Sequence, residues 1–242
     1  MIVALAQVRS ETGQVQRNVD RHLAALESLG PADLVAFPEL SLSNYAPEVA
    51  EAVALTPDDA RLAPLRRHAD ATGTALAVGA PIRTPGKPAI GLIAFVPGAA
   101  PVVIGKGHLH PDEAPTFSPA ADGPGVLDLA VRVGVAICYE LSVPAHADAL
   151  VAGGAAVYLA SVAKTPRGVE AARAALAATA RRHGVPALLV NSVGTCEGVP
   201  AGGGSFALDA AGRLLARLGP EAEGALRVDV ARQTAEAARL GD

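Results

Sequence analysis

Three residues with different chemistry each follow a short apolar run. Glu39 comes two residues after the run LVAF, Lys106 two residues after VVI, and Cys138 directly after VGVAI. In layered α/β proteins the functional groups gather at the carboxyl ends of strands, so we expect these three ends to meet in one crevice. A carboxylate, an ammonium group and a thiol would then be neighbours.

This set of groups is sufficient for acyl transfer. A free thiol has a pKa of about 8.5 and is mostly protonated at neutral pH, so it needs a base or a cation beside it. Glu39 can act as the base, provided that burial or a second carboxylate raises its pKa. Lys106 can stabilise both the thiolate of Cys138 and the oxyanion that forms when sulfur attacks a carbonyl or nitrile carbon. One such preorganised donor lowers the barrier by roughly 3 kcal/mol.

The elements that must position these residues are short strands separated by helices. Apolar, partly β-branched runs of strand length are flanked by Gly, Pro or Asp and cover residues 2–8, 33–37, 74–80, 89–96, 101–104, 131–137, 154–160 and 186–193. Towards the end of the chain, residues 203–218 predict a hairpin and residues 224–230 a further strand. Strands alternating with helices, with an added hairpin, predict an α/β layered fold.

Three segments predict helices. The apolar residues of segment 15–29 fall on one helical face. Thr56, followed by a proline and two aspartates, predicts the start of a second helix that ends at Gly73. The segment 166–183 is rich in Ala, Arg and Glu, and Gly184 follows it as a C-cap.

The composition favours a single domain in a reducing compartment. The chain has 242 residues and a net charge of −4. Half of its residues are apolar but only 3% of all residues are aromatic, so its core must be built from small aliphatic side chains. No basic run is longer than a pair of arginines, which makes nucleic acid an unlikely partner. The two cysteines form no CxxC motif and fit neither a disulfide framework nor a zinc knuckle.

The start MIVALAQVRS lacks the basic region of a signal peptide, and prolines and glycines interrupt the longest uncharged stretch. We therefore expect a cytoplasmic protein without a membrane span.

The motifs around the three residues carry a resemblance to a known family. FPEL around Glu39, KGHL from Lys106 and ICYEL around Cys138 resemble the nitrilase superfamily of carbon-nitrogen hydrolases, whose catalytic residues follow in the order Glu, Lys, Cys. The resemblance extends over most of the chain. It implies a four-layer α-β-β-α sandwich as one domain of residues 1–242, hydrolysis of a non-peptide C–N bond, no metal or organic cofactor, and assembly into homodimers or larger homo-oligomers.

The resemblance also implies roles for individual residues. Glu39 is then the general base, Lys106 the stabiliser of oxyanion and substrate, and Cys138 the nucleophile. Glu113, seven residues beyond Lys106, holds that lysine and raises the proton affinity of Glu39. The implied mechanism is a double displacement, in which the substrate loses ammonia or an amine, remains as a thioester on sulfur, and is released as the acid by water.

Further residues are expected around this site. The backbone N–H of Tyr139 follows the nucleophile directly and would complete the oxyanion hole. Four residues follow predicted strand ends near the site, so we expect them to line the substrate pocket; they are Asn44, Tyr45, Tyr139 and Ser161. Cys196 has no base or cation of its own in the sequence pattern, and we interpret it as a packing or pocket-wall residue.

The sequence departs from the family in two places that concern substrate choice. Members commonly carry an arginine soon after the Cys-Tyr-acid motif, whereas this chain continues with Leu141 and Ser142. The tryptophan common after the sixth strand is replaced within the segment ASVAK that ends at Lys164. An aliphatic amide, a dicarboxylate monoamide, a carbamoyl compound and a nitrile all stay open as substrates.

Other chemistries use residues of the same segments. A metal site could be imitated by residues that follow Lys106, but no fixed ligand motif completes it; they are His108, His110, Asp112 and Glu113. A Cys138–His146 dyad is the rival catalytic pair, although closeness in sequence is a poor guide to catalytic geometry. A non-catalytic ligand-binding or regulatory relative is the rival function. Nitrile hydrolysis and acyl transfer to an acceptor other than water use the same triad.

Overall fold

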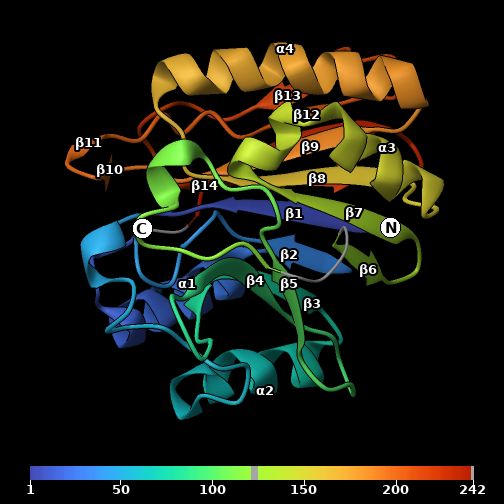
Figure 1. The fold of residues 1–242 in the computed structure, drawn as a ribbon. Helices are drawn as coiled ribbons and strands as arrows, with labels where there is room; N and C mark the ends of the chain where they lie inside the picture. Colours follow the sequence, from blue (N-terminus) through green and yellow to red (C-terminus); the bar gives the residue numbers. More distant parts are fainter. Residues whose placement is uncertain (121–124, 241–242) are drawn as a thin grey trace.

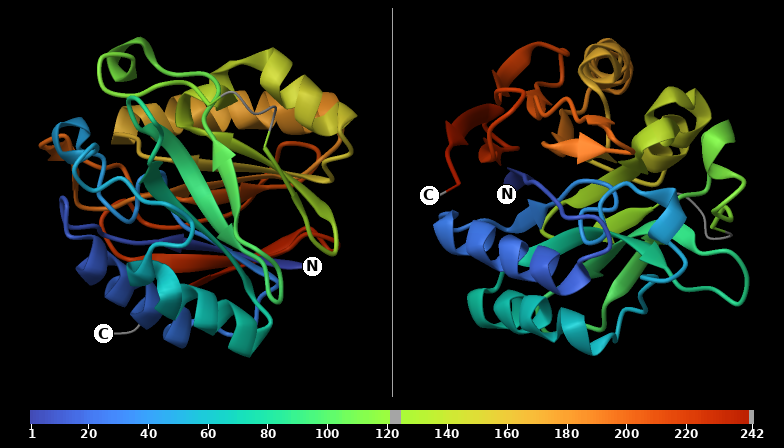
Figure 2. Two further views of the ribbon diagram at one scale, coloured as in Figure 1. Left: turned by 60° about the horizontal axis from the view of Figure 1, so that its bottom comes forward. Right: turned by 90° about the vertical axis from the view of Figure 1, so that its left-hand side faces the viewer.

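The computed structural model describes residues 1–120 and 125–240, which form four layers (Figures 1 and 2). Two sheets face each other, and each carries helices on its outer side. The helices α1 (Val15–Ser28) and α2 (Ala63–Thr72) cover one sheet, and α3 (Pro144–Ala152) and α4 (Pro166–His183) cover the other. The predicted α-β-β-α sandwich is thereby confirmed. No helix among these residues is both long and apolar enough to cross a membrane.

The first sheet positions Glu39 and Lys106. Its described strands run in the order β15 (Thr234–Ala238), β14 (Gly224–Asp229), β1 (Ile2–Gln7), β2 (Leu34–Ala36), β3 (Ala75–Ile82), β4 (Ala89–Phe95) and β5 (Val102–Gly105). Strands β1, β2 and β3 are parallel, and β4 and β5 each pair antiparallel with the strand before. Two antiparallel steps restore the original direction, so β2 and β5 end at the same edge of the sheet.

The second sheet positions Cys138. Its described strands run in the order β13 (Leu214–Arg217), β12 (Phe206–Leu208), β9 (Ala187–Asn191), β8 (Val157–Val162), β7 (Arg132–Ile137) and β6 (Val126–Asp128). Strands β7, β8 and β9 are parallel, and Cys138 follows the end of β7. A separate small ladder joins β10 (Thr195–Cys196) to β11 (Val199–Pro200).

The apolar runs are continuous because both faces of the central strands are buried. In β1, Val3 and Leu5 face the core between the sheets, while Ala4 and Ala6 face the helices. Successive side chains of a strand point to opposite faces, which explains this division. In β1 the larger residues lie between the sheets, whereas in β3 the small Ala75 and Ala77 lie there and Leu76 and Val78 face the helices.

Most of the predicted element bounds agree with the structure. Helix α4 has the predicted limits, with the side chain of Thr165 as its N-cap and Gly184 in the left-handed conformation after it. The prediction that a helix starts at Thr56 was wrong. Asp59 instead caps a 3-10 turn, η2 (Ala60–Leu62), by accepting from the N–H of Arg61, and α2 follows that turn. The short strands β6, β10, β11 and β15 were not predicted.

Buried polar residues of α1 hold the segment that carries Glu39. The side-chain amide of Asn18 donates to the carbonyl of Leu42 at 3.0 Å, and the imidazole of His22 contacts the hydroxyl of Ser41 at 2.9 Å. Both side chains are fully buried. Since buried polar groups are costly without partners, these contacts fix the segment after β2 against the helix.

Gly79 of β3 allows the same segment to approach the sheet. A methyl group at this position would overlap the carbonyl oxygen of Pro38 and the backbone nitrogen of Leu40, the two neighbours of Glu39. The backbone N–H of Leu42 donates to the carbonyl of Gly79 at 2.9 Å, so the approach also forms a hydrogen bond. The position of Glu39 therefore depends on the absence of a side chain at residue 79.

Replacing Gly79 should displace the base. We expect Gly79→Ala to lower the free energy of unfolding by about 1–3 kcal/mol, because the added methyl group meets backbone rather than a flexible side chain. We also expect kcat to fall, because the added methyl group displaces Glu39. Gly86→Ala is the matched control, because a methyl group there meets nothing within 4 Å. Chemical denaturation and kcat of both variants check this prediction, and a Gly79→Ala protein with the stability and kcat of the control would contradict it.

Candidate active site

Lys106 lies between two carboxylates that come from different parts of the chain. Its ammonium group donates to Oε1 of Glu39 at 2.7 Å and to Oε1 of Glu113 at 2.6 Å. All three side chains are almost completely buried. Burial alone would lower the pKa of Lys106, but the charges of Glu39, Cys138 and Glu113 together raise it above its ordinary value. The ammonium group therefore stays charged.

Glu39 retains an oxygen that no hydrogen bond occupies. Its Oε1 accepts from Lys106, whereas Oε2 is buried and has no partner among the described residues. Burial raises the pKa of Glu39, Lys106 opposes that effect, and the charge of Glu113 adds to it. The net result is a carboxylate with an increased affinity for a proton.

Cys138 has a backbone conformation that is unusual for a residue with a side chain. It follows the extended Ile137, has a φ angle of 46°, and begins the 3-10 turn η4 (Cys138–Ser142). A left-handed conformation costs roughly 1–2 kcal/mol for most residues and often marks functional sites. Burial, together with the charge of Glu39, raises the pKa of the thiol to about 11. The sulfur is therefore protonated at neutral pH.

Glu113 and Tyr45 form the outer part of this network. Glu113 ends the 3-10 turn η3 (Pro111–Glu113), and its Oε2 accepts from the backbone N–H of His110 at 2.7 Å. The hydroxyl of Tyr45 donates to Oε1 of Glu113 at 2.9 Å. Burial and the nearby charges of Glu39 and Glu113 raise the pKa of Tyr45, so its hydroxyl remains a donor. The structure thus brings Tyr45 together with Glu113 and Lys106.

The other residues expected at the pocket make contacts of their own. Ser161 is fully buried, and its hydroxyl donates to the carbonyl of Phe37 at 2.9 Å, which joins β8 to the segment before Glu39. Asn44 donates to the carbonyl of Thr195 at 2.9 Å and thereby fixes the β10 ladder to its own loop. The ring of Tyr139 packs edge-on against the ring of His110, with the centroids 5.3 Å apart.

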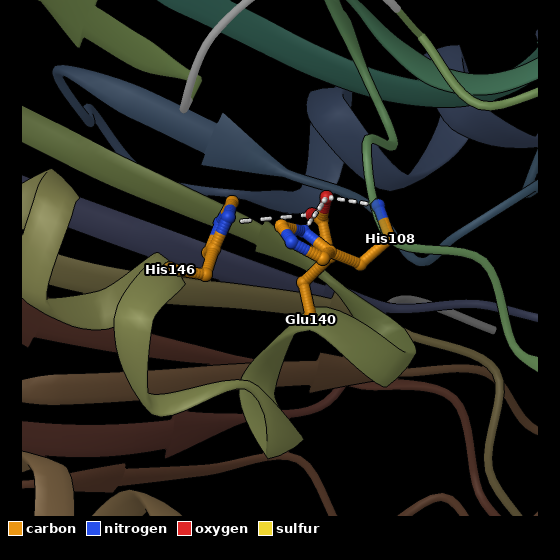
Figure 3. Close-up of side chains that lie close together, drawn as sticks. All are labelled: His108, Glu140 and His146. Carbon is orange, nitrogen blue, oxygen red and sulfur yellow. Dashed lines mark hydrogen bonds and ion pairs between the residues drawn. The ribbon is translucent and has the colours of Figure 1, made fainter.

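Glu140 is a buried residue of the site to which the sequence reasoning gave no role. Its Oε2 accepts from the backbone N–H of Ile137 at 2.8 Å, and its Oε1 accepts from the N–H of Gly107 at 2.7 Å. The same Oε1 also accepts from the backbone N–H of His108 at 3.2 Å (Figure 3). One carboxylate therefore joins the residue before Cys138 to the residue after Lys106. An acid at the third position of a turn after a strand was the available signal, because side chains there often cap backbone N–H groups.

The histidines of the same region group around Glu140. The nearest ring nitrogens of His108 and His146 lie 3.8 Å and 3.7 Å from its carboxylate oxygens, and the three side chains form a set that could hold a metal ion (Figure 3). However, the carboxylate already accepts three backbone N–H groups, and His146 contacts the carbonyl of Val135 at 3.2 Å. The structure therefore groups His108 with Glu140 rather than with His110 and Glu113, and the contacts of the His146 ring are with Glu140 and Val135.

Comparisons with known proteins find similar sequences and similar structures. A family model described as carbon-nitrogen hydrolase matches residues 2–240. The (R)-stereoselective amidase of Pseudomonas sp. is 30% identical over 226 residues, which cover 90% of this chain and 81% of that protein. A double mutant of the amidase from Nesterenkonia sp. AN1 in complex with acrylamide has a TM-score of 0.84 at 27% identity, with 95% of this chain and 90% of that chain covered. Another variant of that amidase shows covalent addition of the acetamide moiety of fluoroacetamide at the active site cysteine; it has a TM-score of 0.82 at 28% identity, with coverages of 95% and 90%.

Neutralising Glu140 should disturb the spacing between Lys106 and Cys138. In Glu140→Gln an amide NH₂ must face one of the backbone N–H groups, so at least one of the three hydrogen bonds is lost. We expect kcat to fall roughly tenfold to hundredfold with a smaller change in KM, since small misplacements of catalytic groups have effects of this size.

The control for this prediction is Glu170→Gln, because the ion pairs of Glu170 within the described ranges are exposed ones, with Arg173 and Arg217. Steady-state kinetics and thermal melting of both variants are the measurements. A folded Glu140→Gln protein with the kcat of the Glu170→Gln protein would refute the role of Glu140.

Proposed function

The chain belongs to the carbon-nitrogen hydrolase family, and we propose that it hydrolyses small-molecule amides through a thioester on Cys138, with Glu39 and Lys106 completing a catalytic triad. The observation that carries this proposal is the buried Lys106–Glu39 ion pair, which acts electrostatically on the thiol of Cys138. The (R)-stereoselective amidase and the acetamide adduct on the cysteine of the Nesterenkonia amidase support an amide substrate and a covalent mechanism.

The first half of the reaction forms the thioester. Oε2 of Glu39, which has no hydrogen bond of its own, takes the proton of Cys138 as the sulfur attacks the amide carbon. The carbonyl electrons move to oxygen, where the ammonium group of Lys106 and the backbone N–H of Tyr139 stabilise the negative charge. The protonated Glu39 then gives its proton to the amide nitrogen, the C–N bond breaks, and ammonia leaves.

The second half of the reaction releases the acid. Glu39 takes a proton from water as the water oxygen attacks the thioester carbon, and the same oxyanion contacts stabilise the new intermediate. The C–S bond breaks, the sulfur recovers the proton from Glu39, and the carboxylic acid departs. All bonds and protons are restored, so the cycle needs no organic cofactor or metal.

Glu113 supports both halves without touching the reacting atoms. Its carboxylate forms the second ion pair of Lys106, and its charge raises the pKa of Glu39. Tyr45 keeps Glu113 in place through its hydroxyl. A carboxyl group with a raised pKa holds its proton long enough at neutral pH to pass it to a leaving amine.

Three sequence-based predictions stay predictions: a single domain, a cytoplasmic location and a homo-oligomer.

Trapping the intermediate tests the proposed function. Incubation with a panel of small amides and nitriles should leave an acyl group on Cys138, detected by mass spectrometry, and should release ammonia. In Cys138→Ala both signals should disappear, whereas Cys196→Ala should keep them. A transferase would form the adduct but release it only to an added nucleophile, and a non-catalytic relative would show neither signal. If nitriles were hydrolysed and amides were not, the substrates would be nitriles and the proposed amide class would be wrong.

The pH dependence of kcat/KM should report the raised pKa of Glu39. Protonation of Glu39 removes the base, so the acidic limb should lie above 4.5, the ordinary value for a glutamate. Because the pKa of the thiol is about 11, the profile should stay flat from neutral pH to about pH 10. In Glu113→Gln one negative charge beside Glu39 is lost, so the acidic limb should move to lower pH. An acidic limb at the same pH or at a higher pH in this variant would contradict the assigned effect of Glu113 on Glu39.

A further inference from the structure

Lys164 lies beside the nucleophile but belongs to none of the contacts described above. Strands β7 and β8 are parallel, with Ile137 opposite Ser161, so the residue after β7 lies next to the segment after β8. The backbone N–H of Ala163 lies close enough to the thiol of Cys138 to lower its pKa. Lys164 is the next residue along this segment.

The backbone of Lys164 is held on both sides. Its N–H donates to Oδ1 of Asn191 at 2.8 Å, and its carbonyl accepts from Nδ2 of Asn191 at 3.0 Å and from the N–H of Gly202 at 2.6 Å. Asn191 is fully buried. The starting point of the lysine side chain is therefore fixed, and only its own side-chain dihedrals move the ammonium group.

The ammonium group of Lys164 has no protein partner among the described residues. The chain has two other lysines: Lys106 is paired with two carboxylates, and Lys87 donates to the carbonyl of Ala114 at 2.8 Å. Lys164 is only partly buried. Of the two lysines that favour the thiolate of Cys138, it has the larger effect. A cation close to the nucleophile is thus left available for a ligand.

Carboxylates gather where the β10–β11 turn meets Tyr45 and Glu113. Glu197 of the β10–β11 turn donates its backbone N–H to the carbonyl of Tyr45 at 3.0 Å. Burial raises the pKa of Glu197, and the charges of Glu48, Asp112 and Glu113 raise it further, so these carboxylates lie close together. An anionic group on a substrate is repelled from the side of Tyr45 and Glu113, whereas Lys164 attracts it.

We propose that Lys164 is a specificity-determining residue that binds an anionic group on the acyl part of the substrate, so that the preferred amides are monoamides of short dicarboxylic acids. This inference rests on the proposed function. The amide nitrogen faces Glu39 and the carbonyl oxygen faces Lys106, which leaves the acyl chain to extend towards the third charged group. A carboxylate on that chain then forms a charge-assisted hydrogen bond with the ammonium group of Lys164.

The first test compares amides that differ only in this charge. Succinamate and glutaramate are matched in length by butyramide and valeramide, in which a methyl group replaces the carboxylate. The readout is the ratio of kcat/KM between the acidic and the neutral member of each pair, because any general effect on the thiol cancels in that ratio. We expect the wild type to favour at least one acidic member, and Lys164→Met to lower that ratio about tenfold or more.

Two further variants complete the series. Lys164→Arg should retain part of the preference because it keeps the charge, and Lys87→Met should retain all of it because this lysine lies on an exposed loop far along the chain from Lys164. Thermal melting shows whether each variant is folded. A ratio that is unchanged in folded Lys164→Met, or a wild type that favours neither acidic amide, would overturn the inference.

A second measurement does not need turnover. Iodoacetate and iodoacetamide alkylate the same thiol and differ in charge, and peptide mapping distinguishes Cys138 from Cys196. The ratio of the iodoacetate rate to the iodoacetamide rate at Cys138 should fall several-fold in Lys164→Met and stay constant in Lys87→Met. An unchanged ratio counts against an anion site. If the wild type hydrolyses neutral amides without any charge preference, only the specificity inference fails; if it hydrolyses no amide, the proposed function fails and the inference with it.

Discussion

The ammonium group of Lys106, buried between Glu39 and Glu113, is the interaction on which the site depends. A buried ammonium group without partners would cost several kcal/mol or lose its proton, and here two carboxylates compensate it. Two anions and one cation leave an excess negative charge. Glu113 accepts from the N–H of His110 and the hydroxyl of Tyr45, whereas Oε2 of Glu39 has no donor in the part of the chain that the structure describes. The excess therefore appears as proton affinity at Glu39, where a base is required.

The fold keeps this arrangement by fixing the loops at the strand ends rather than the side chains alone. Leu40, Asn44 and Cys138 all have positive φ angles, and each lies in a segment that follows β2 or β7. Such conformations cost of order 1–3 kcal/mol each and persist only where the surroundings determine them. The surroundings are visible here: α1 and Gly79 hold the first segment, and Glu140 holds the second. The apolar side chains buried between the two sheets and beneath the helices stabilise the fold and offset the conformational free energy of the strained residues.

The sequence allowed the prediction of whatever depends on local pattern. Continuous apolar runs identified the central strands, and the helix-forming composition of residues 166–183 with Gly184 after it gave α4 its limits. The order of Glu39, Lys106 and Cys138 gave the family. Contacts between distant segments could not be predicted, because Glu140, Ser161 and Asn44 acquire their partners only in the folded chain. The wrong start of α2 has a local reason: both Thr56 and Asp59 are good caps, and the carboxylate of Asp59 also binds the guanidinium group of its neighbour Arg61.

The two lysines beside the sulfur differ in what a substrate does to them. Lys106 is neutralised by protein carboxylates, so its effect on the thiol is the same with or without a ligand. Lys164 has no such partner, and a carboxylate on the substrate would cancel its charge. The thiol would then lose the cation that favours its ionised form most, and its proton affinity would rise as the substrate binds. Attack on an acidic amide therefore depends even more on proton transfer to Glu39 than attack on a neutral amide, so the base and the specificity residue are electrostatically linked through the sulfur between them.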